Sequence, residues 1–208
     1  MDAAEATNKD VAKGERFNLT KGNAGDHNFY VGLGWNAGDS HDLDASVFAL
    51  DGNGKLVSDK HFVYFSNLKS PDGAIVHSGD NLTGEGDGDD EQIRFYLDKL
   101  DPRVEELSIV VCIYQANTKH QNFGQVSKAY VQVASMDAAG NPPTVSDGRG
   151  GLKVDPLTRF PLSDDYGKFT AIQVGSIYKR DDGEWGFNPT GVGFEGAEIG
   201  DILKHYTV

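Results

Sequence analysis

Apolar residues recur at every second position in many short stretches of this chain, which is the period of a β-strand with one buried face. In the clearest stretch, residues 29–35, the four odd-numbered residues from Phe29 to Trp35 are all large and apolar. Residues 107–114 (LSIVVCIY) are apolar on both faces. We expect this second stretch to be a central strand that is covered on both sides.

Shorter apolar stretches follow one another along the chain and are separated by turn sequences. Asp51 to Lys55 (DGNGK) and Asp181 to Gly183 (DDG) are typical of hairpin turns, and residues 71–73 (PDG) of a β-turn. The candidate strands are residues 17–19, 43–50, 62–65, 74–76, 93–97, 129–133, 158–162, 171–178 and 185–187. Many short strands with regular turns predict an all-β fold, an antiparallel β-sandwich.

Helical signals are few. Residues 199–206 place four apolar side chains at the helical spacing i, i+3, i+4 and i+7, which predicts a C-terminal helix packed on a sheet. Asp101 and Pro102 resemble a helix start and predict one helical turn over residues 103–106. Residues 121–124 predict a turn or short helix. The sandwich is therefore expected to carry a few short helices besides the C-terminal one.

Composition divides the chain into a tail and one large unit. Residues 1–13 are small, polar and charged, and we expect them to be disordered. Residues 14–208 are expected to form a single β-sandwich domain. Within it, residues 137–151 are rich in Gly, Pro, Ser and Asp, which predicts a long surface loop or insertion.

The segment from Gly79 to Glu91 (GDNLTGEGDGDDE) combines six carboxylates with four glycines. The glycines allow the chain to fold tightly on itself, whereas six like charges in so small a volume repel one another. A hard divalent cation with oxygen ligands is the natural counter-charge. We therefore predict a calcium-binding loop; a solvated acidic loop is the ordinary alternative.

Asp42 and Asp44 form a second acidic group, at the start of the candidate strand 43–50. Residues two apart on a strand share a face, so both carboxylates can point at one site. The pair is a weak signal by itself. It becomes informative only if the two carboxylates face the glycine-rich loop across a shared metal site.

Three rival motifs fit the acidic segment poorly. An EF-hand would place Asp80 first and Glu91 twelfth, but Leu82 and Gly84 then stand where side-chain oxygens are needed. A phosphate-binding loop needs Gly-Lys-Ser/Thr, which is absent from the sequence. A zinc site is disfavoured because the six histidines are scattered. His77, directly before the loop, is interpreted as an ordinary hydrogen-bonding residue.

Charge and cysteine content narrow the functional classes. The 208 residues include 19 Lys and Arg and 32 Asp and Glu, a net charge of −13. The two acidic motifs account for most of this negative charge. An acidic surface disfavours the binding of nucleic acid and favours the binding of cations. The single cysteine, Cys112, lies in an apolar run and is interpreted as a small buried hydrophobe. The N-terminal residues lack the apolar core of a signal peptide, and no apolar stretch is long enough to span a bilayer. We therefore expect a cytoplasmic protein with no direct membrane insertion.

Several motifs together resemble the TerD family of tellurium-resistance and stress-response proteins. They include Asp42-Leu-Asp-Ala-Ser46, Phe65-Ser-Asn-Leu68, Ser70-Pro-Asp-Gly73, the acidic segment to Glu91 and Gly193-Phe-Glu-Gly196 before the terminal helix. The resemblance covers roughly residues 15–208. It implies a β-sandwich with two neighbouring calcium sites at one end, a role in tellurite resistance and other stresses, and no enzymatic activity.

The resemblance also implies a ligand set and a partner. The expected ligands or near neighbours of the ions are Asp42, Asp44, Asp80, Asn81, Asp87, Asp89, Asp90 and Glu91, with backbone carbonyls such as that of Leu82. Family members are expected to act with a protein partner, for which a membrane-bound Ter complex is the candidate. Asn36 replaces an Asp that is common in the family, which predicts one weaker site.

The leading hypothesis is a calcium-binding, non-enzymatic stress-response module, and two other functions compete with it. The first alternative is a divalent-metal-dependent phosphoester hydrolase, which needs open metal positions and usually a nearby base or cation for the phosphate. The acidic segment contains no Lys or Arg, which counts against it. The second is a calcium-dependent sugar-binding sandwich, which the lack of a secretion signal disfavours.

Overall fold

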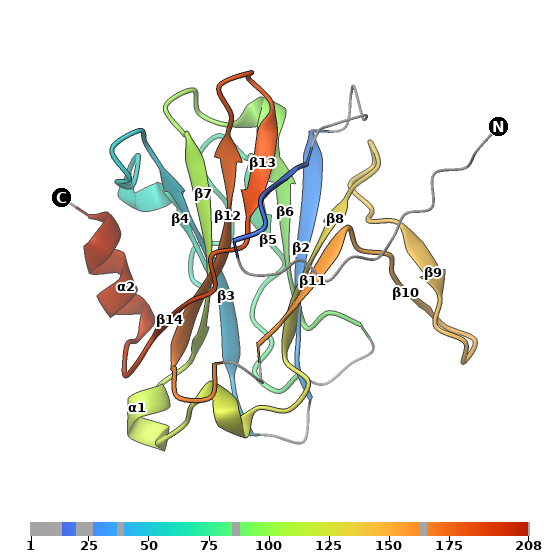
Figure 1. Ribbon diagram of the computed structural model, residues 1–208, viewed down its shortest axis with the longest axis vertical. Coiled ribbons are helices and arrows are strands. Elements are labelled where there is room, and N and C mark those ends of the chain that lie inside the picture. Colours follow the sequence, from blue (N-terminus) through green and yellow to red (C-terminus); the bar gives the residue numbers. More distant parts are fainter. Residues whose placement is uncertain (1–13, 20–26, 37–39, 85–87, 163–165, 208) are drawn as a thin grey trace.

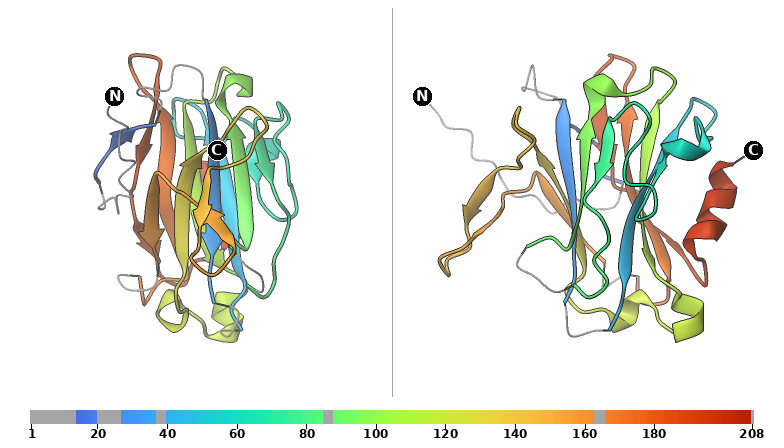
Figure 2. Two further views of the ribbon diagram at one scale, coloured as in Figure 1. Left: turned by 90° about the vertical axis from the view of Figure 1, so that its right-hand side faces the viewer. Right: turned by 180° about the vertical axis from the view of Figure 1, so that it is seen from behind.

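Two antiparallel β-sheets pack face to face in the computed structural model, with a helix on one outer side and a hairpin on the other (Figure 1). The structure describes residues 14–19, 27–36, 40–84, 88–162 and 166–207. The view from behind shows the same two layers edge-on (Figure 2, right). The predicted all-β sandwich is confirmed. The predicted disordered tail, residues 1–13, lies outside the described residues.

The larger sheet has seven strands. Its order is β1 (Phe17–Asn18), β13 (Trp185–Asn188), β12 (Ala171–Lys179), β7 (Glu106–Ile113), β3 (Leu43–Leu50) and β4 (Phe62–Val63), with β14 (Val192–Phe194) also paired to β12. Strand β7 pairs with β12 on one side and with β3 on the other. Ile109 and Val111 enter the core between the sheets, while Val110 and Cys112 face the outer side. The predicted central strand is confirmed.

The smaller sheet has five strands, in the order β11 (Thr158–Pro161), β8 (Tyr130–Ser135), β2 (Asn28–Gly34), β6 (Glu91–Tyr96) and β5 (Ile75–His77). The acidic segment connects β5 to β6, so strands hold it on both sides. The register pairs Leu33 of β2 with Glu91 of β6. Glu91, the last acidic residue of the segment, is therefore fixed at one end of the sandwich.

The C-terminal helix α2 (Ile199–Tyr206) covers the outer face of the seven-stranded sheet (Figure 1). Its Ile202 packs with Phe48, Phe62 and Cys112 in a second apolar cluster outside the main core. Burial raises the pKa of the Cys112 thiol, so this side chain is an inert packing residue, as predicted. No helix of the described ranges is long and apolar enough to cross a bilayer.

The short helices differ in part from the prediction. Residues 103–106 form no helix: the Asp101 carboxylate accepts hydrogen bonds from the Arg103 backbone N–H and guanidinium, closing a turn before β7 begins at Glu106. The 3₁₀ turn η3 (Phe123–Gln125) confirms the predicted short helix. The one-turn helix α1 (Ala116–Lys119) was not predicted. Two further 3₁₀ turns are η1 (Asp59–His61) and η2 (Leu97–Lys99).

Residues 137–151 are not simply a loop. They contain β9 (Thr144–Ser146), which pairs with β10 (Leu152–Val154) in a hairpin that projects from the side of the five-stranded sheet (Figure 2). The three residues of β9 are exposed. Because five of the six residues in these two strands are exposed, the sequence lacks the alternation that identifies the other strands. The segment predicted as a surface loop therefore contains a strand, β9, whose residues are exposed.

Candidate metal site

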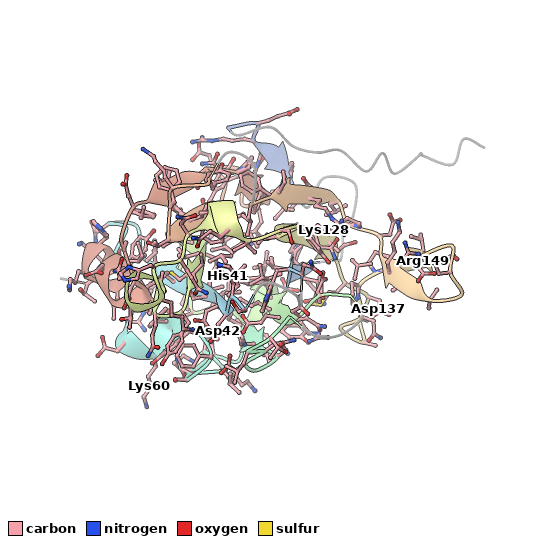
Figure 3. All side chains as sticks on the ribbon, turned by 90° about the horizontal axis from the view of Figure 1, so that it is seen from below. His41, Asp42, Lys60, Lys128, Asp137 and Arg149 are labelled. Atoms are coloured by element: carbon pink, nitrogen blue, oxygen red, sulfur yellow. The ribbon has the colours of Figure 1, made fainter. Side chains whose placement is uncertain are left out.

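Three carboxylates meet at the end of the sandwich where β3 begins. Asp42 lies directly before β3, Asp44 lies within it, and Asp80 comes from the segment after β5. One oxygen atom from each lies within 4.8 Å of those of the other two. The backbone of Asp42 is fixed because its carbonyl accepts a hydrogen bond from Tyr114 N–H (2.8 Å). Figure 3 looks along the strands from this end, with Asp42 and His41 labelled.

Two of the three carboxylates are withdrawn from water. Asp42 and Asp44 are only 8% and 7% exposed, whereas Asp80 is exposed. Asp42 Oδ1 is buried and has no hydrogen-bond partner among the residues that the structure describes. A buried oxygen without a donor costs free energy unless another group satisfies it. The site therefore has an unused acceptor at its base and an open side at Asp80.

Burial and mutual repulsion oppose ionisation of this cluster. Burial, followed by the charges of Glu91, Asp42 and Asp80, raises the pKa of Asp44 to about 8. Burial and Asp80 raise the pKa of Asp42 as well. Lys119 opposes both increases but does not cancel them. A cation placed among the three carboxylates reverses this balance, because an opposite charge favours the ionised form.

Glu91 links the two sheets beside this cluster. Its side chain is fully buried, and Oε2 accepts a hydrogen bond from the Ala45 N–H of β3 (2.7 Å). His77 Nδ1 accepts the Gly79 N–H (3.0 Å), so Nε2 carries the proton and lies 3.1 Å from Ala45 O and 3.5 Å from Glu91 Oε2. His77 is thus a hydrogen-bonding residue, but one that joins the acidic segment to both sheets.

Asn81 and Asp90 stabilise the turn above the cluster. Asn81 Oδ1 accepts hydrogen bonds from the backbone N–H groups of Thr83 and Gly84 (both 3.1 Å), and Asp90 Oδ2 accepts one from Trp35 N–H (2.9 Å). Gly84 has φ +62° and packs on the Trp35 indole, where a Cβ would lie 2.5 Å from Nε1. Burial raises the pKa of Asp90. This turn holds Asn81 beside Glu91, whose Oε1 lies 3.4 Å from Asn81 N.

The remaining members of the expected ligand set are Leu82, Asp87 and Asp89. Leu82, expected to contribute its backbone carbonyl, is 62% exposed. Asp87 lies outside the described residues. Asp89 faces the outer side of the five-stranded sheet, where Tyr30 donates to its Oδ2 (2.7 Å) and Tyr130 to its Oδ1 (2.8 Å). The structure therefore gathers Asp42, Asp44 and Asp80, keeps Asn81, Asp90 and Glu91 close to them, and directs Asp89 away.

Sequence reasoning did not identify the partners of Asp89. Tyr30, Tyr130 and Gln132 lie on the outward faces of β2 and β8, and all three donate hydrogen bonds to its carboxylate. The available signal was the alternation of residues 29–35, which assigns Tyr30 to the face opposite the apolar one. Asn36 donates through Nδ2 to Ser127 Oγ (3.2 Å).

Comparison with known proteins shows the family to which the chain belongs. A family model described as the TerD domain matches residues 8–206. Tellurium resistance protein TerD of Serratia marcescens is 39% identical over 202 residues, covering 95% of this chain and 96% of that protein. General stress protein 16U of Bacillus subtilis (strain 168) is 38% identical over 192 residues, covering 90% and 91%.

A solved structure also matches the fold. The crystal structure of a homologue of telluride resistance protein (TerD) from Streptomyces coelicolor A3(2) superposes with a TM-score of 0.64 at 26% identity, covering 84% of this chain and 94% of that one. The family model and the curated relatives both span most of the sequence. The chain therefore belongs to the TerD family of tellurium-resistance and stress-response proteins.

Proposed function

We propose that this chain is a calcium-binding, non-enzymatic module of the stress response linked to tellurite resistance. The observation that carries the proposal is the meeting of Asp42, Asp44 and Asp80, with Asp42 Oδ1 buried and unpartnered among the described residues. A site made of carboxylate oxygens suits a hard cation. Asp42, directly before β3, and Asp44, within it, would hold the ion from the sheet, and Asp80 would close over it from the loop.

Neighbouring oxygens extend the donor set. Glu91, Asn81 and Asp90 lie around the turn next to the cluster, and the Leu82 carbonyl and Asp87 remain in the proposed set. Calcium accepts six to eight oxygens in flexible geometry, whereas Mg²⁺ demands a near-ideal octahedron and keeps much of its water. The unequal mixture of buried and exposed carboxylates therefore favours calcium. Two ions, as the family resemblance implies, remain part of the proposal.

The proposed role of calcium is to shape a surface for a protein partner. A bound cation would neutralise the repulsion among the carboxylates and fix the loop between β5 and β6. Leu82, 62% exposed in that loop, would then be presented in one arrangement. An apolar side chain on an ordered acidic loop is a feature that another protein can recognise. A membrane-bound Ter complex is the proposed partner.

Calorimetric titration of chelator-stripped protein with Ca²⁺ tests the proposal, with Mg²⁺ as the competing ion. We expect Ca²⁺ to bind and Mg²⁺ to be ignored. Asp44→Asn removes a buried ligand and should weaken Ca²⁺ binding by more than about tenfold, whereas Asp59→Asn, an exposed aspartate in η1, should leave it unchanged. Absence of calcium binding would reject the proposal. A preference for Mg²⁺ would instead favour the alternative of a metal-dependent phosphoester hydrolase. A turnover screen on generic phosphoesters would detect that activity.

A further inference from the structure

We infer that Asp89 is a positioning residue rather than a metal ligand, and that it anchors the acidic segment in a carboxylate recess on the outer face of the five-stranded sheet. We call the side chains of Tyr30, Tyr130 and Gln132, together with Gly32 beneath them, the Asp89 recess. The inference rests on the proposed calcium site, because it concerns how the segment that supplies Asp80, Asp90 and Glu91 is held in place.

Three neutral donors saturate the Asp89 carboxylate. Tyr30 OH donates to Oδ2 (2.7 Å), Tyr130 OH donates to Oδ1 (2.8 Å), and Gln132 Nε2 lies 2.8 and 2.7 Å from the two oxygens. Carboxylates that accept this many hydrogen bonds are well stabilised without a cation. This contrasts with Asp42, whose Oδ1 has no partner among the described residues.

The donors are themselves held in the donating orientation. Arg159 Nη2 donates to Gln132 Oε1 (3.0 Å), which fixes the amide so that its Nε2 faces Asp89. The Arg159 guanidinium also lies 3.9 Å from the centre of the Tyr130 ring. Burial, followed by the charge of Asp89, raises the pKa of both phenols, so Tyr30 and Tyr130 keep the protons that they donate.

Glycine makes room for the carboxylate on the strand. A Cβ added to Gly32 would overlap Asp89 Oδ2 and its carboxyl carbon. A Cβ added to Gly34 would lie 2.6 Å from the Tyr130 ring. The recess therefore requires small residues at two alternate positions of β2, whose outward face would otherwise be filled by side chains.

The recess separates three consecutive acidic residues. Asp89 is held on the outer face, Asp90 accepts the Trp35 N–H, and Glu91 points between the sheets to Ala45 N. The Asp90 N–H donates to Leu33 O (2.8 Å), which continues the pairing of β2 with β6 up to this point. Anchoring Asp89 therefore fixes where the segment leaves the metal site and enters β6, without contributing an oxygen to the ion.

A double-mutant comparison with Ca²⁺ as the probe tests this inference. The variants of the full chain are Asp89→Asn, the pair Tyr30→Phe/Tyr130→Phe, and all three substitutions together, each checked for folding by circular dichroism. We expect Asp89→Asn to weaken Ca²⁺ binding about 10- to 100-fold without changing the number of ions bound. The tyrosine pair should also weaken binding although every carboxylate remains. The triple variant should bind no more weakly than Asp89→Asn.

A control variant and the number of bound ions distinguish failure of this inference from failure of the proposed function. Tyr178→Phe, which removes a phenol from the other sheet, should leave Ca²⁺ binding unchanged. Gln132→Leu removes the third donor and replaces the tyrosine pair if that pair does not fold. A lower number of bound ions in Asp89→Asn, or unchanged binding in the tyrosine pair, overturns the inference alone. Wild-type protein that binds no Ca²⁺ overturns the proposed function and this inference with it.

Discussion

Carboxylates at two places in the sandwich have opposite surroundings. At the start of β3, in the seven-stranded sheet, Asp42 Oδ1 is buried without a hydrogen-bond partner among the described residues, and burial raises the pKa of Asp44 to about 8. On the outer face of the five-stranded sheet, Asp89 receives hydrogen bonds from Tyr30, Tyr130 and Gln132. Both groups belong to acidic motifs that look alike in the sequence. The two groups differ in the hydrogen-bond donors that the fold supplies, and we propose that only the group at the start of β3 binds a cation.

This contrast limits what a count of acidic residues can predict. A carboxylate with saturated oxygens would lose its hydrogen bonds on binding a metal, so its net gain is small. A carboxylate with an unpartnered buried oxygen gives up no hydrogen bond at that oxygen when it binds a metal, so it gains the full metal–oxygen interaction.

The largest expected effect is stabilisation by calcium. At free Ca²⁺ about one hundred times Kd, each site should add roughly 2.7 kcal/mol to the free energy of unfolding. The melting temperature should therefore be higher in excess Ca²⁺ than in chelator, with Mg²⁺ giving no comparable increase. The increase should be smaller in Asp44→Asn and unchanged in Asp59→Asn. Equal melting temperatures of the wild-type protein in Ca²⁺ and chelator would contradict the part of the comparison that concerns Asp42 and Asp44.

Loss of Glu91 should destabilise the metal-free protein itself. Glu91→Ala leaves the buried Ala45 N–H without its acceptor, and an unsatisfied buried donor costs about 1–3 kcal/mol. Urea unfolding in chelator measures this loss. Glu195→Ala, which removes an exposed carboxylate, should change the unfolding free energy by much less. Similar losses in the two variants would show that Glu91 does not join the sheets energetically.

The raised pKa of Asp44 predicts a specific pH dependence of stability in the absence of metal. The folded protein keeps the Asp44 proton up to about pH 8, whereas the unfolded chain releases it near the ordinary value of 3.8. The folded state then binds more protons, so this group makes stability fall as pH rises from about 4 to about 8, by up to about 1.4 kcal/mol per pH unit.

The measurement is urea unfolding at several pH values in chelator, comparing wild-type protein with Asp44→Asn. Because asparagine does not titrate, the variant should lose this downward contribution between about pH 4 and pH 8. Parallel pH profiles for the two proteins would show that burial does not raise the pKa of Asp44. Calcium should also release protons near pH 7, which titrations in buffers of different ionisation enthalpy would detect.

The smallest expected effect comes from one phenol of the Asp89 recess. Tyr30→Phe removes a hydrogen bond to Asp89 and should cost about 1 kcal/mol of unfolding free energy, because Tyr130 and Gln132 remain as donors. Urea unfolding in chelator measures it. The loss should be absent when Asp89→Asn is already present. An equal loss in both backgrounds would place the effect of Tyr30 in its packing alone.

Much of the fold followed from local patterns. The alternation of residues 29–35, the doubly apolar run at 107–114 and the helical spacing near the C-terminus predicted β2, β7 and α2, because each pattern reports a buried face directly. The sequence also suggested that Asp42 and Asp44 face the glycine-rich loop, and the structure brings them together with Asp80.

The failures have local and long-range causes. The helical turn predicted from Asp101 and Pro102 is absent, because the Asp101 carboxylate closes a turn with Arg103 instead. The hairpin β9–β10 is mostly exposed, so it produces no alternating pattern. The position of Asp89 is set by the register of β2 against β8, which brings Gly32 opposite Gln132. That register is not encoded near residue 89.

A crystal structure of the protein with bound Ca²⁺ tests the central contrast most directly. We predict an ion coordinated by Asp42, Asp44 and Asp80 at the calcium–oxygen distances of about 2.3–2.6 Å, with Asp89 still hydrogen-bonded to Tyr30 and Tyr130. A calcium ion coordinated by Asp89, or a structure with excess Ca²⁺ in which Asp42, Asp44 and Asp80 hold no ion, would contradict the account.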